Sequence, residues 1–174
     1  MGPVPDLLTR RLALSLLTID DADEIFEMRG DSRVMAFWDW PADPDRDVTR
    51  AVVAEMVREA SLGRAKHRTL RLRSGGTFVG LCDLSELRAG ESAHIGFMLG
   101  RRHWGLGLGQ EGVTAVLDHA RQSGFKAVFA RVHDGNERSV RLLERLGFVA
   151  TRSIQECEIR PGVFCECRTF GRTF

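Results

Sequence analysis

The most constraining feature of the chain is a glycine-rich segment in its second half, HWGLGLGQEGV, which spans residues 103–113. It stands between an apolar run that is typical of a strand and a pattern of apolar residues at helical spacing. Glycine lets a backbone pass close to an anion, and the first N–H groups of a helix have no partner within that helix. The segment therefore predicts a phosphate-binding loop that opens a helix.

The same letters also fit a dinucleotide fingerprint. Gly107, Gly109 and Gly112 match G-x-G-x-x-G, and Asp134 stands where an acidic residue would hold a ribose. A nicotinamide-binding fold, however, usually begins with its glycine turn, whereas this loop follows what reads as an antiparallel meander. A Walker-type loop is excluded as well, because no G-K-[ST] follows the glycines. We therefore expect the loop to hold a different pyrophosphate.

The rest of the chain reads as the elements of one mixed α/β fold. Alternating or apolar runs predict strands at 11–17, 68–73, 77–84, 92–99, 126–132, 148–159 and 163–174. Helical periodicity and capping residues predict helices after Thr18, at 45–62, at 110–124 and at 136–147. The order β-α-α-β-β-β-α-β-α-β-β, without repeats or linkers, predicts a single domain over residues 1–174.

Composition and charge exclude several classes of protein. Of the 174 residues, 43% are hydrophobic and 28% are charged, and the formal net charge is +1 without a long basic or acidic run. This balance argues against a dedicated nucleic-acid-binding or membrane-surface protein. No apolar stretch approaches the roughly 18–20 residues of a membrane span, and MGPVPDLLTRR lacks the apolar core of a secretory leader. We expect a cytoplasmic protein without a nucleic-acid or membrane partner, and leave open whether it forms a homodimer.

Four cysteines bear on metal binding and redox state. Cys82 stands alone, whereas the C-E-C motif places Cys165 and Cys167 on one face of a strand, not far along the chain from Cys157. A metal site there is one interpretation, and free thiols in a reducing compartment are the favoured one because no C-x-x-C spacing occurs. Four histidines likewise show no metal-like spacing: His67, His103, His119 and His133. We therefore expect no metal.

Several motifs in order resemble those of the GNAT N-acetyltransferase superfamily. The loop WGLGLG at 104–109 is similar to that family's acetyl-CoA loop, [R/Q]-x-x-G-x-[G/A], and NERSVRLLERLGF at 136–148 is similar to its N-x-x-S…L-E-k-x-GF. Trp104 replaces the usual Arg or Gln, which points to the ribosomal-protein N-terminal acetyltransferases of the RimJ/RimL type. Their strand and opening motifs also resemble HIGFML and LLTRRLAL. The resemblance implies a GNAT fold, a mixed and mostly antiparallel seven-stranded sheet flanked by about four helices.

The resemblance also implies acetyl-CoA as the cosubstrate and assigns the residues that hold it. The pantetheine arm would pair with the strand backbone at Phe97, Met98 and Leu99, where an N–H such as that of Met98 would polarise the thioester carbonyl. Asn136 would bond the pantetheine. The pyrophosphate would be bound through the loop, to which we assign Arg102, Trp104, Gly105, Leu106, Gly107, Leu108 and Gly109.

The catalytic groups are less usual. Many relatives use a tyrosine as the acid, near the position of Leu143, but this chain contains no tyrosine. Ser139 is then the candidate for hydrogen bonding or relaying a proton to the leaving thiolate, while a helix-surface role is its structural alternative. His94 occupies the place of the family's acidic residue and is the candidate base. Competing bases are water and three carboxylates: Glu86, Glu158 and Glu166.

The acceptor site is expected along residues 34–47 and at the C-terminal hairpin. Trp38 and Trp40 would form a platform there with Glu86 nearby, and Asp39 and Asp43 would attract a cationic amine. We expect acetyl transfer in a ternary complex to a primary amine, foremost the α-amine of a protein or peptide. The alternatives are a small-molecule amine, such as an amino acid, polyamine or aminoglycoside, and a non-catalytic acyl-CoA-binding regulator.

Overall fold

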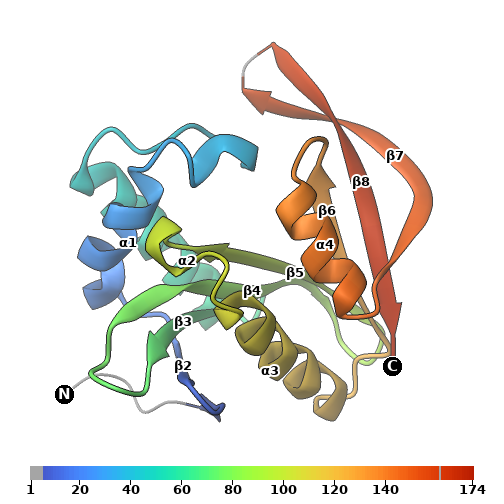
Figure 1. Cartoon of the computed structure of the whole chain (residues 1–174), viewed down its shortest axis with the longest axis horizontal. Helices are drawn as coiled ribbons and strands as arrows, with labels where there is room; N and C mark the ends of the chain where they lie inside the picture. Colours follow the sequence, from blue (N-terminus) through green and yellow to red (C-terminus); the bar gives the residue numbers. More distant parts are fainter. Residues whose placement is uncertain (1–5, 161) are drawn as a thin grey trace.

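The computed structural model describes residues 6–160 and 162–174 and shows one twisted sheet with helices on both faces (Figure 1). Residues 1–5, which fall in the stretch where no secretory leader is expected, lie outside the described part. The strands lie in the order β1-β2-β3-β4-β5-β6-β8-β7, and within this part of the chain only β5 and β6 pair in parallel. The mixed, mostly antiparallel α/β fold with four α-helices is confirmed, and the two-residue β1 adds an eighth strand to the seven expected.

The elements follow the predicted order closely. The strands are β1 (Leu7–Leu8), β2 (Leu12–Leu16), β3 (Lys66–Leu72), β4 (Phe78–Arg88), β5 (Ser92–Leu99), β6 (Ala127–His133), β7 (Val149–Arg160) and β8 (Val163–Thr173). The helices are α1 (Ala22–Arg29), α2 (Arg46–Ser61), α3 (Leu108–Gln122) and α4 (Glu137–Arg145). Short 3-10 turns stand at Ile19–Asp21, Met35–Phe37 and Arg101–His103.

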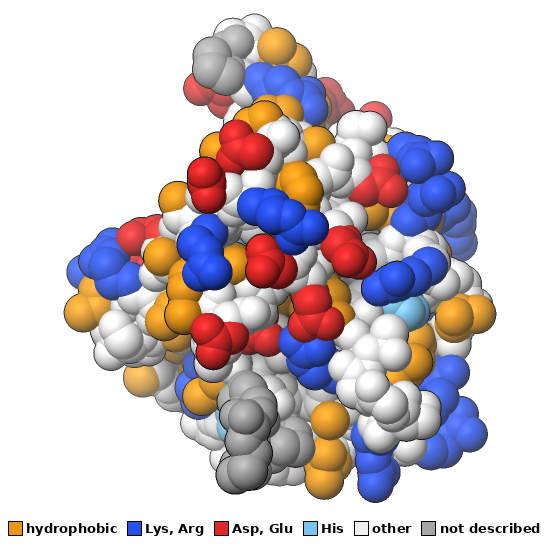
Figure 2. All heavy atoms as spheres, turned by 90° about the vertical axis from the view of Figure 1, so that its left-hand side faces the viewer, with side chains coloured by type: hydrophobic (Ala, Val, Ile, Leu, Met, Phe, Trp, Pro, Cys, Tyr) orange, Lys and Arg blue, Asp and Glu red, His pale blue; other side chains and the backbone are white. Residues whose placement is uncertain are grey.

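Two hydrophobic cores lie on opposite faces of the sheet. Successive residues of a strand point to opposite faces, so Ala93 and Ile95 of β5 join the core under α3 and α4, whereas Met98 joins the core under α1 and α2. The helices α3 and α4 therefore cover one face and α1 and α2 the other (Figure 1). Most charged side chains are exposed, whereas a few, among them Arg29, Asp43 and Arg68, are buried. Figure 2 shows acidic and basic groups interspersed over one face of the molecule. Among the described residues, no helix is long and apolar enough to cross a membrane.

Candidate active site

The two parallel strands β5 and β6 are paired at one end and diverge beyond it, and we call the place where they diverge the opening. β5 and β6 are paired only at Ser92–His94 and Ala127–Phe129, and beyond that point β6 continues beside β8 alone. Figure 1 shows the two strands diverging from their paired ends. Within the described part of the chain, the later residues of β5 have no strand beside them on this side, so their backbone can pair with an extended ligand.

The register decides which β5 groups face the opening. The N–H of Gly100 donates to the Val79 carbonyl of β4 at 3.0 Å, whereas the Leu99 carbonyl points the other way and accepts from the Trp104 indole Nε1 at 2.8 Å. The β4–β5 ladder runs without a shift from Gly80 to Ser85. Because backbone groups alternate in direction along a strand, the N–H and C=O groups of Phe97 and Leu99 point toward the opening, and those of Met98 point toward β4. The geometry thus favours the amide of Phe97 over that of Met98 as the group that would polarise a thioester.

The glycine loop has the backbone that an anion site requires. Gly105 and Gly107 have φ of 76° and 75°, a left-handed conformation that side-chain-bearing residues rarely adopt, and Gly107 caps α3. Gly109 lies in the first helical turn, where an added Cβ would meet Leu99 and Leu142 side chains at 3.5–3.6 Å. The first amides of α3 are unpaired within the helix and carry its positive dipole end. This cradle fits the pyrophosphate of acetyl-CoA, with Leu106 exposed and Leu108 buried beneath it.

Arg11 and Glu111 connect this loop to the start of β2, and neither residue is among those predicted from the sequence. Arg11 donates to the Leu106 carbonyl at 2.9 Å and forms an ion pair with Glu111 at 2.7 Å. Burial opposes the charge of Glu111, but hydrogen bonds from Thr9 and Arg11 outweigh it and lower the pKa of this carboxyl from 4.5 to about 2. Arg11 stands in LLTRRLAL, the opening motif, which was the one available signal.

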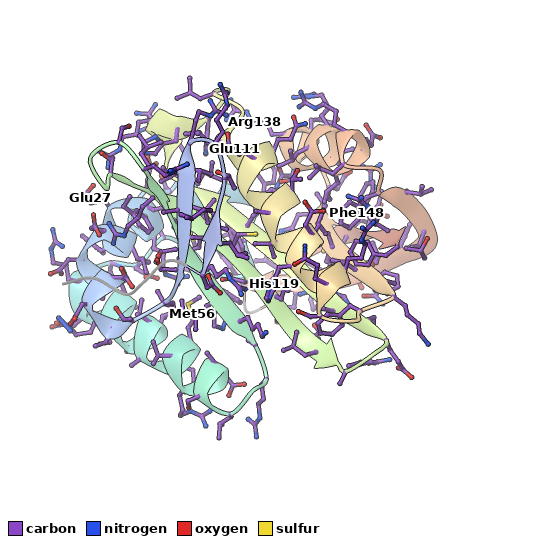
Figure 3. All side chains as sticks on the ribbon, turned by 90° about the horizontal axis from the view of Figure 1, so that it is seen from below. Glu27, Met56, Glu111, His119, Arg138 and Phe148 are labelled. Carbon is purple, nitrogen blue, oxygen red and sulfur yellow. The ribbon has the colours of Figure 1, made fainter. Side chains whose placement is uncertain are left out.

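Two arginines and one histidine lie around the loop. His103 is buried, lies 3.0 Å from the Phe78 carbonyl, and has a pKa lowered by burial, so it supplies no charge. Arg102 is exposed but forms a 3.5 Å ion pair with Glu27 of α1. Arg138, which is not among the residues predicted from the sequence, stacks over the Trp104 ring with its guanidinium carbon 4.4 Å from the centroid. Figure 3 shows Arg138 and Glu111 at the N-terminal end of α3.

The start of α4 brings the Asn136 and Ser139 motif beside this loop. The Asn136 side chain accepts from the Ser139 backbone N–H at 3.3 Å, so Asn136 is a helix cap whose side-chain NH₂ remains for a ligand. Ser139 is half-buried, and its hydroxyl has no hydrogen-bond partner among the described residues. Leu143 is fully buried in the core and leaves no polar group at the tyrosine position.

His94 and Glu86 meet at the paired end of the opening. The His94 Nε2 atom lies 3.7 Å from a Glu86 carboxylate oxygen, and the His94 ring lies 5.9 Å from that of Phe129. Glu86 has φ of 47° at an irregularity in β4, which is uncommon for a residue other than glycine and often marks a functional position. Both side chains are solvent-accessible.

The segment from Phe37 to Trp40, which follows α1 along the chain, crosses the opening on the side opposite to α3. Trp38 lies over β5, with its ring 4.0 Å from the position of a Cβ built on Gly96. The neighbouring Asp39 accepts from His133 and Arg131 of β6, at 2.7 and 3.2 Å. Trp38 and Trp40 form a tilted pair with ring centroids 6.5 Å apart. The segment therefore connects the diverging strands.

The comparisons with known proteins agree with this geometry. The family model described as the acetyltransferase (GNAT) domain matches residues 11–149. The chain belongs to the GNAT acetyltransferase family. It is therefore an acyltransferase, and the resemblance inferred from the motifs is confirmed.

Individual GNAT relatives differ in what they acetylate. The uncharacterized N-acetyltransferase p20 of Bacillus licheniformis is 28% identical over 169 residues, covering 95% of this chain and 94% of that protein. The solved structure of RimL, a ribosomal L7/L12 alpha-N-protein acetyltransferase in complex with coenzyme A, has a TM-score of 0.85 at 16% identity, with 99% and 98% covered. The spermidine N-acetyltransferase from Vibrio cholerae with CoA and spermine has a TM-score of 0.81 at 18% identity, with 95% and 96% covered. Identities this low show the fold and leave the acceptor open.

One expectation about an acceptor carboxylate in this GNAT chain is wrong. Asp43 is buried, pairs with Arg29 at 2.6 Å and accepts from Thr49 at 2.6 Å, so it cannot attract an amine. Burial opposes the charge of Asp43, yet these hydrogen bonds lower the pKa of its carboxyl. Asp39 is similarly engaged by β6. The competing bases Glu158 and Glu166 are exposed on the β7–β8 hairpin, where Glu158 accepts from the Gly162 N–H near the hairpin tip.

Proposed function

We propose that the chain transfers acetyl from acetyl-CoA to a primary amine, and that the amine is the N-terminus of a protein or peptide. The observation that supports this most is the opening between β5 and β6. It has the α3 phosphate cradle on one side and the Trp38–Asp39 segment on the other. Donor and acceptor would then reach the free β5 edge from opposite faces, as direct transfer in a ternary complex requires.

The groups at this opening supply the parts of the reaction. Acetyl-CoA brings an activated thioester, whose carbonyl would accept a hydrogen bond from the Phe97 amide. His94 takes a proton from the attacking amine, directly or through water, and the Ser139 hydroxyl hydrogen-bonds to the departing sulfur. A cysteine acyl-enzyme is disfavoured, since burial raises the pKa of the Cys82 thiol and keeps it unreactive.

Charge favours a peptide over a polyamine as the acceptor. A polyamine carries several positive charges and needs free carboxylates, but Asp43 forms an ion pair with Arg29 and Asp39 forms one with Arg131. An N-terminal peptide presents one amine and an extended backbone, which suits an aromatic platform beside an open strand edge. The small-amine acceptor, favoured by the fold of the spermidine enzyme, is the competing possibility.

An acceptor panel tests the proposal. The protein is incubated with acetyl-CoA and, separately, a peptide with a free N-terminus, the same peptide with a blocked N-terminus, spermidine, and free amino acids, while released thiol is measured. We expect turnover of the free peptide alone, with one acetyl group on its N-terminus by mass spectrometry. Turnover of spermidine but not peptide would reject the protein acceptor. Absence of thiol release with every amine, despite acetyl-CoA binding, would reject catalysis.

Two variants then test the assigned groups. Ser139→Ala should lower kcat by about 100-fold, the lower end of the range for proton-transfer catalysis, with the Kd of acetyl-CoA unchanged. His94→Gln should lower kcat/KM with the Kd of acetyl-CoA unchanged, because an amide cannot accept the proton of the attacking amine; His119→Gln, on α3, is the matched control. An unchanged kcat/KM in His94→Gln would assign the base to water or Glu86.

A further inference from the structure

Four potential metal ligands gather on one face of the sheet, apart from the groups assigned to acetyl transfer. The strand β8 lies between β6 and β7, and its Cys165 and Cys167 share a face because they are two residues apart. Cys167 stands opposite His133 of β6, and Cys165 stands opposite Cys157 of β7. Directly opposed residues place their side chains on the same face, so three strands contribute to one cluster.

The distances in this cluster suit a tetrahedral metal ion. The ligand atoms of His133, Cys165 and Cys167 all lie within 4.8 Å of one another. The two β8 sulfurs are 3.9 Å apart, and two thiolates on one tetrahedral zinc at its usual 2.3 Å bond length are separated by about 3.8 Å. Only small side-chain adjustments are therefore needed to place an ion between them.

The histidine already has the partner that a metal-binding histidine usually has. His133 Nε2 lies 2.7 Å from Asp39 Oδ1, and the imidazole is almost fully buried. A carboxylate acceptor holds the ring proton on Nε2 and leaves the lone pair of Nδ1 for a ligand. This arrangement is independent of the thiols, since Asp39 comes from the segment after α1.

The donor set indicates which metal. Thiolates and an imidazole favour zinc and other soft or borderline ions over magnesium and calcium, which prefer oxygen. Binding of Zn²⁺ would displace one proton from each of the three coordinating thiols to solvent, and the two positive charges of the ion would offset two of the three thiolate charges.

We propose that His133, Cys157, Cys165 and Cys167 form a binding site for one zinc ion. The ion fastens the β7–β8 hairpin to β6, and through Asp39 it fixes the Trp38 segment that crosses the opening. Figure 1 shows the hairpin extending beyond the ends of β6 and α4, where such a link would restrain it. The zinc has a structural role and takes no part in the transfer itself.

Metal titration of the reduced full-length protein tests the site. Metal is removed with a chelator, the thiols are kept reduced with a phosphine, and Co²⁺ and then Zn²⁺ are added. We expect one Co²⁺ per chain with the thiolate charge-transfer and intense visible bands of tetrahedral sulfur coordination, and stoichiometric displacement by Zn²⁺. Cys165→Ser and Cys167→Ser should abolish these bands, whereas Cys82→Ala, in β4, should leave them unchanged. Asp39→Asn should weaken Zn²⁺ binding about 10- to 100-fold, as loss of an orienting partner does.

Several results would overturn the proposal. These are failure of the reduced protein to take up stoichiometric metal, and uptake that persists in Cys165→Ser, Cys167→Ser and His133→Ala together. A Cys157–Cys165 or Cys165–Cys167 disulfide that forms in air, with no metal uptake after reduction, would identify the cluster as a thiol pair instead. Circular dichroism of each variant without metal separates loss of a ligand from loss of the fold. None of these readouts depends on the acceptor or on turnover.

Discussion

The two sides of the opening between β5 and β6 are built in different ways. On the α3 side the site is made of backbone: left-handed glycines at 105 and 107, free helix amides and the Asn136 cap. On the opposite side it is made of side chains that reach across the fold, with Trp38 over Gly96 of β5 and Asp39 on β6. The donor side would thus recognise a constant ligand, and the acceptor side would determine which amine enters.

This difference determines which contacts hold each side of the opening in place. The segment from Phe37 to Trp40 has little regular structure of its own and depends on anchors at both ends. One anchor is the Asp39 contact with β6, and the other is the buried Asp43–Arg29 pair, which also binds Thr49 at the start of α2. The glycine loop is instead continuous with α3 and is held from outside by Arg11.

The largest effect is expected at the buried acceptor-side anchor. Asp43→Ala leaves the Arg29 guanidinium buried without its partner and should lower the free energy of unfolding by about 3–5 kcal/mol. Asp45→Ala, two residues on, removes only the exposed cap that accepts from the Val48 N–H of α2 and should cost about 1 kcal/mol. Urea denaturation of both variants measures the difference. Equal losses would show that the buried pair is not the anchor of this segment.

The same contrast explains what the sequence could predict. The glycine loop and the Asn136 cap depend on neighbouring residues, so the sequence predicts their positions nearly residue by residue. The roles of Asp39, Asp43 and Glu111 depend on partners distant along the chain, and such partners leave no local pattern. The sequence therefore suggests that Asp43 binds the acceptor amine, although its carboxylate forms a buried ion pair with Arg29. The spacing of the cysteines along the sequence shows only which of them share a face of one strand. That they lie beside His133 follows from the strand order β6-β8-β7, which the sequence does not show.

The next largest effect on the free energy of unfolding is expected at the Arg11–Glu111 ion pair on the donor side, and this effect should depend on pH. Glu111→Gln removes a charge that Thr9 and Arg11 hydrogen-bond, and should lower the free energy of unfolding by about 2 kcal/mol at neutral pH. Because the pKa of Glu111 is lowered from 4.5 to about 2, its contribution is full above pH 4.5 and is lost as the pH falls toward 2. Urea denaturation at several pH values should show the two proteins converging in acid. Glu55→Gln, which removes an exposed ion pair with Arg58 on α2, is the control. A difference in the free energy of unfolding between Glu111→Gln and the unsubstituted protein that stayed constant with pH would refute the charge effect.

Substitutions at two glycines of the loop should distinguish the effect of a left-handed backbone conformation from the effect of an added side chain on packing. Gly107→Ala forces a side chain into the left-handed region and should cost about 1–2 kcal/mol, with a raised KM for acetyl-CoA because the cradle is distorted. Gly109→Ala places its Cβ in ordinary contact with Leu99 and Leu142, away from the cradle, and should leave that KM unchanged or stabilise α3 slightly. Steady-state kinetics and thermal unfolding of both variants check this. Similar KM values in the two variants would mean that the loop does not hold the donor through its backbone.

The smallest effect is expected for the exposed half of the tryptophan pair. Trp38 is half-buried over Gly96, so Trp38→Ala should raise the KM of the acceptor about 10-fold, equivalent to roughly 1.4 kcal/mol, while the KM of acetyl-CoA stays constant. Trp40 is 45% exposed, and Trp40→Ala should change the acceptor KM only a few-fold, because solvent already covers much of its ring. Kinetics with the peptide and acetyl-CoA varied in turn measures both constants. If Trp38→Ala instead raised the KM of acetyl-CoA, the segment would belong to the donor side, and the division of the opening into two sides would fail.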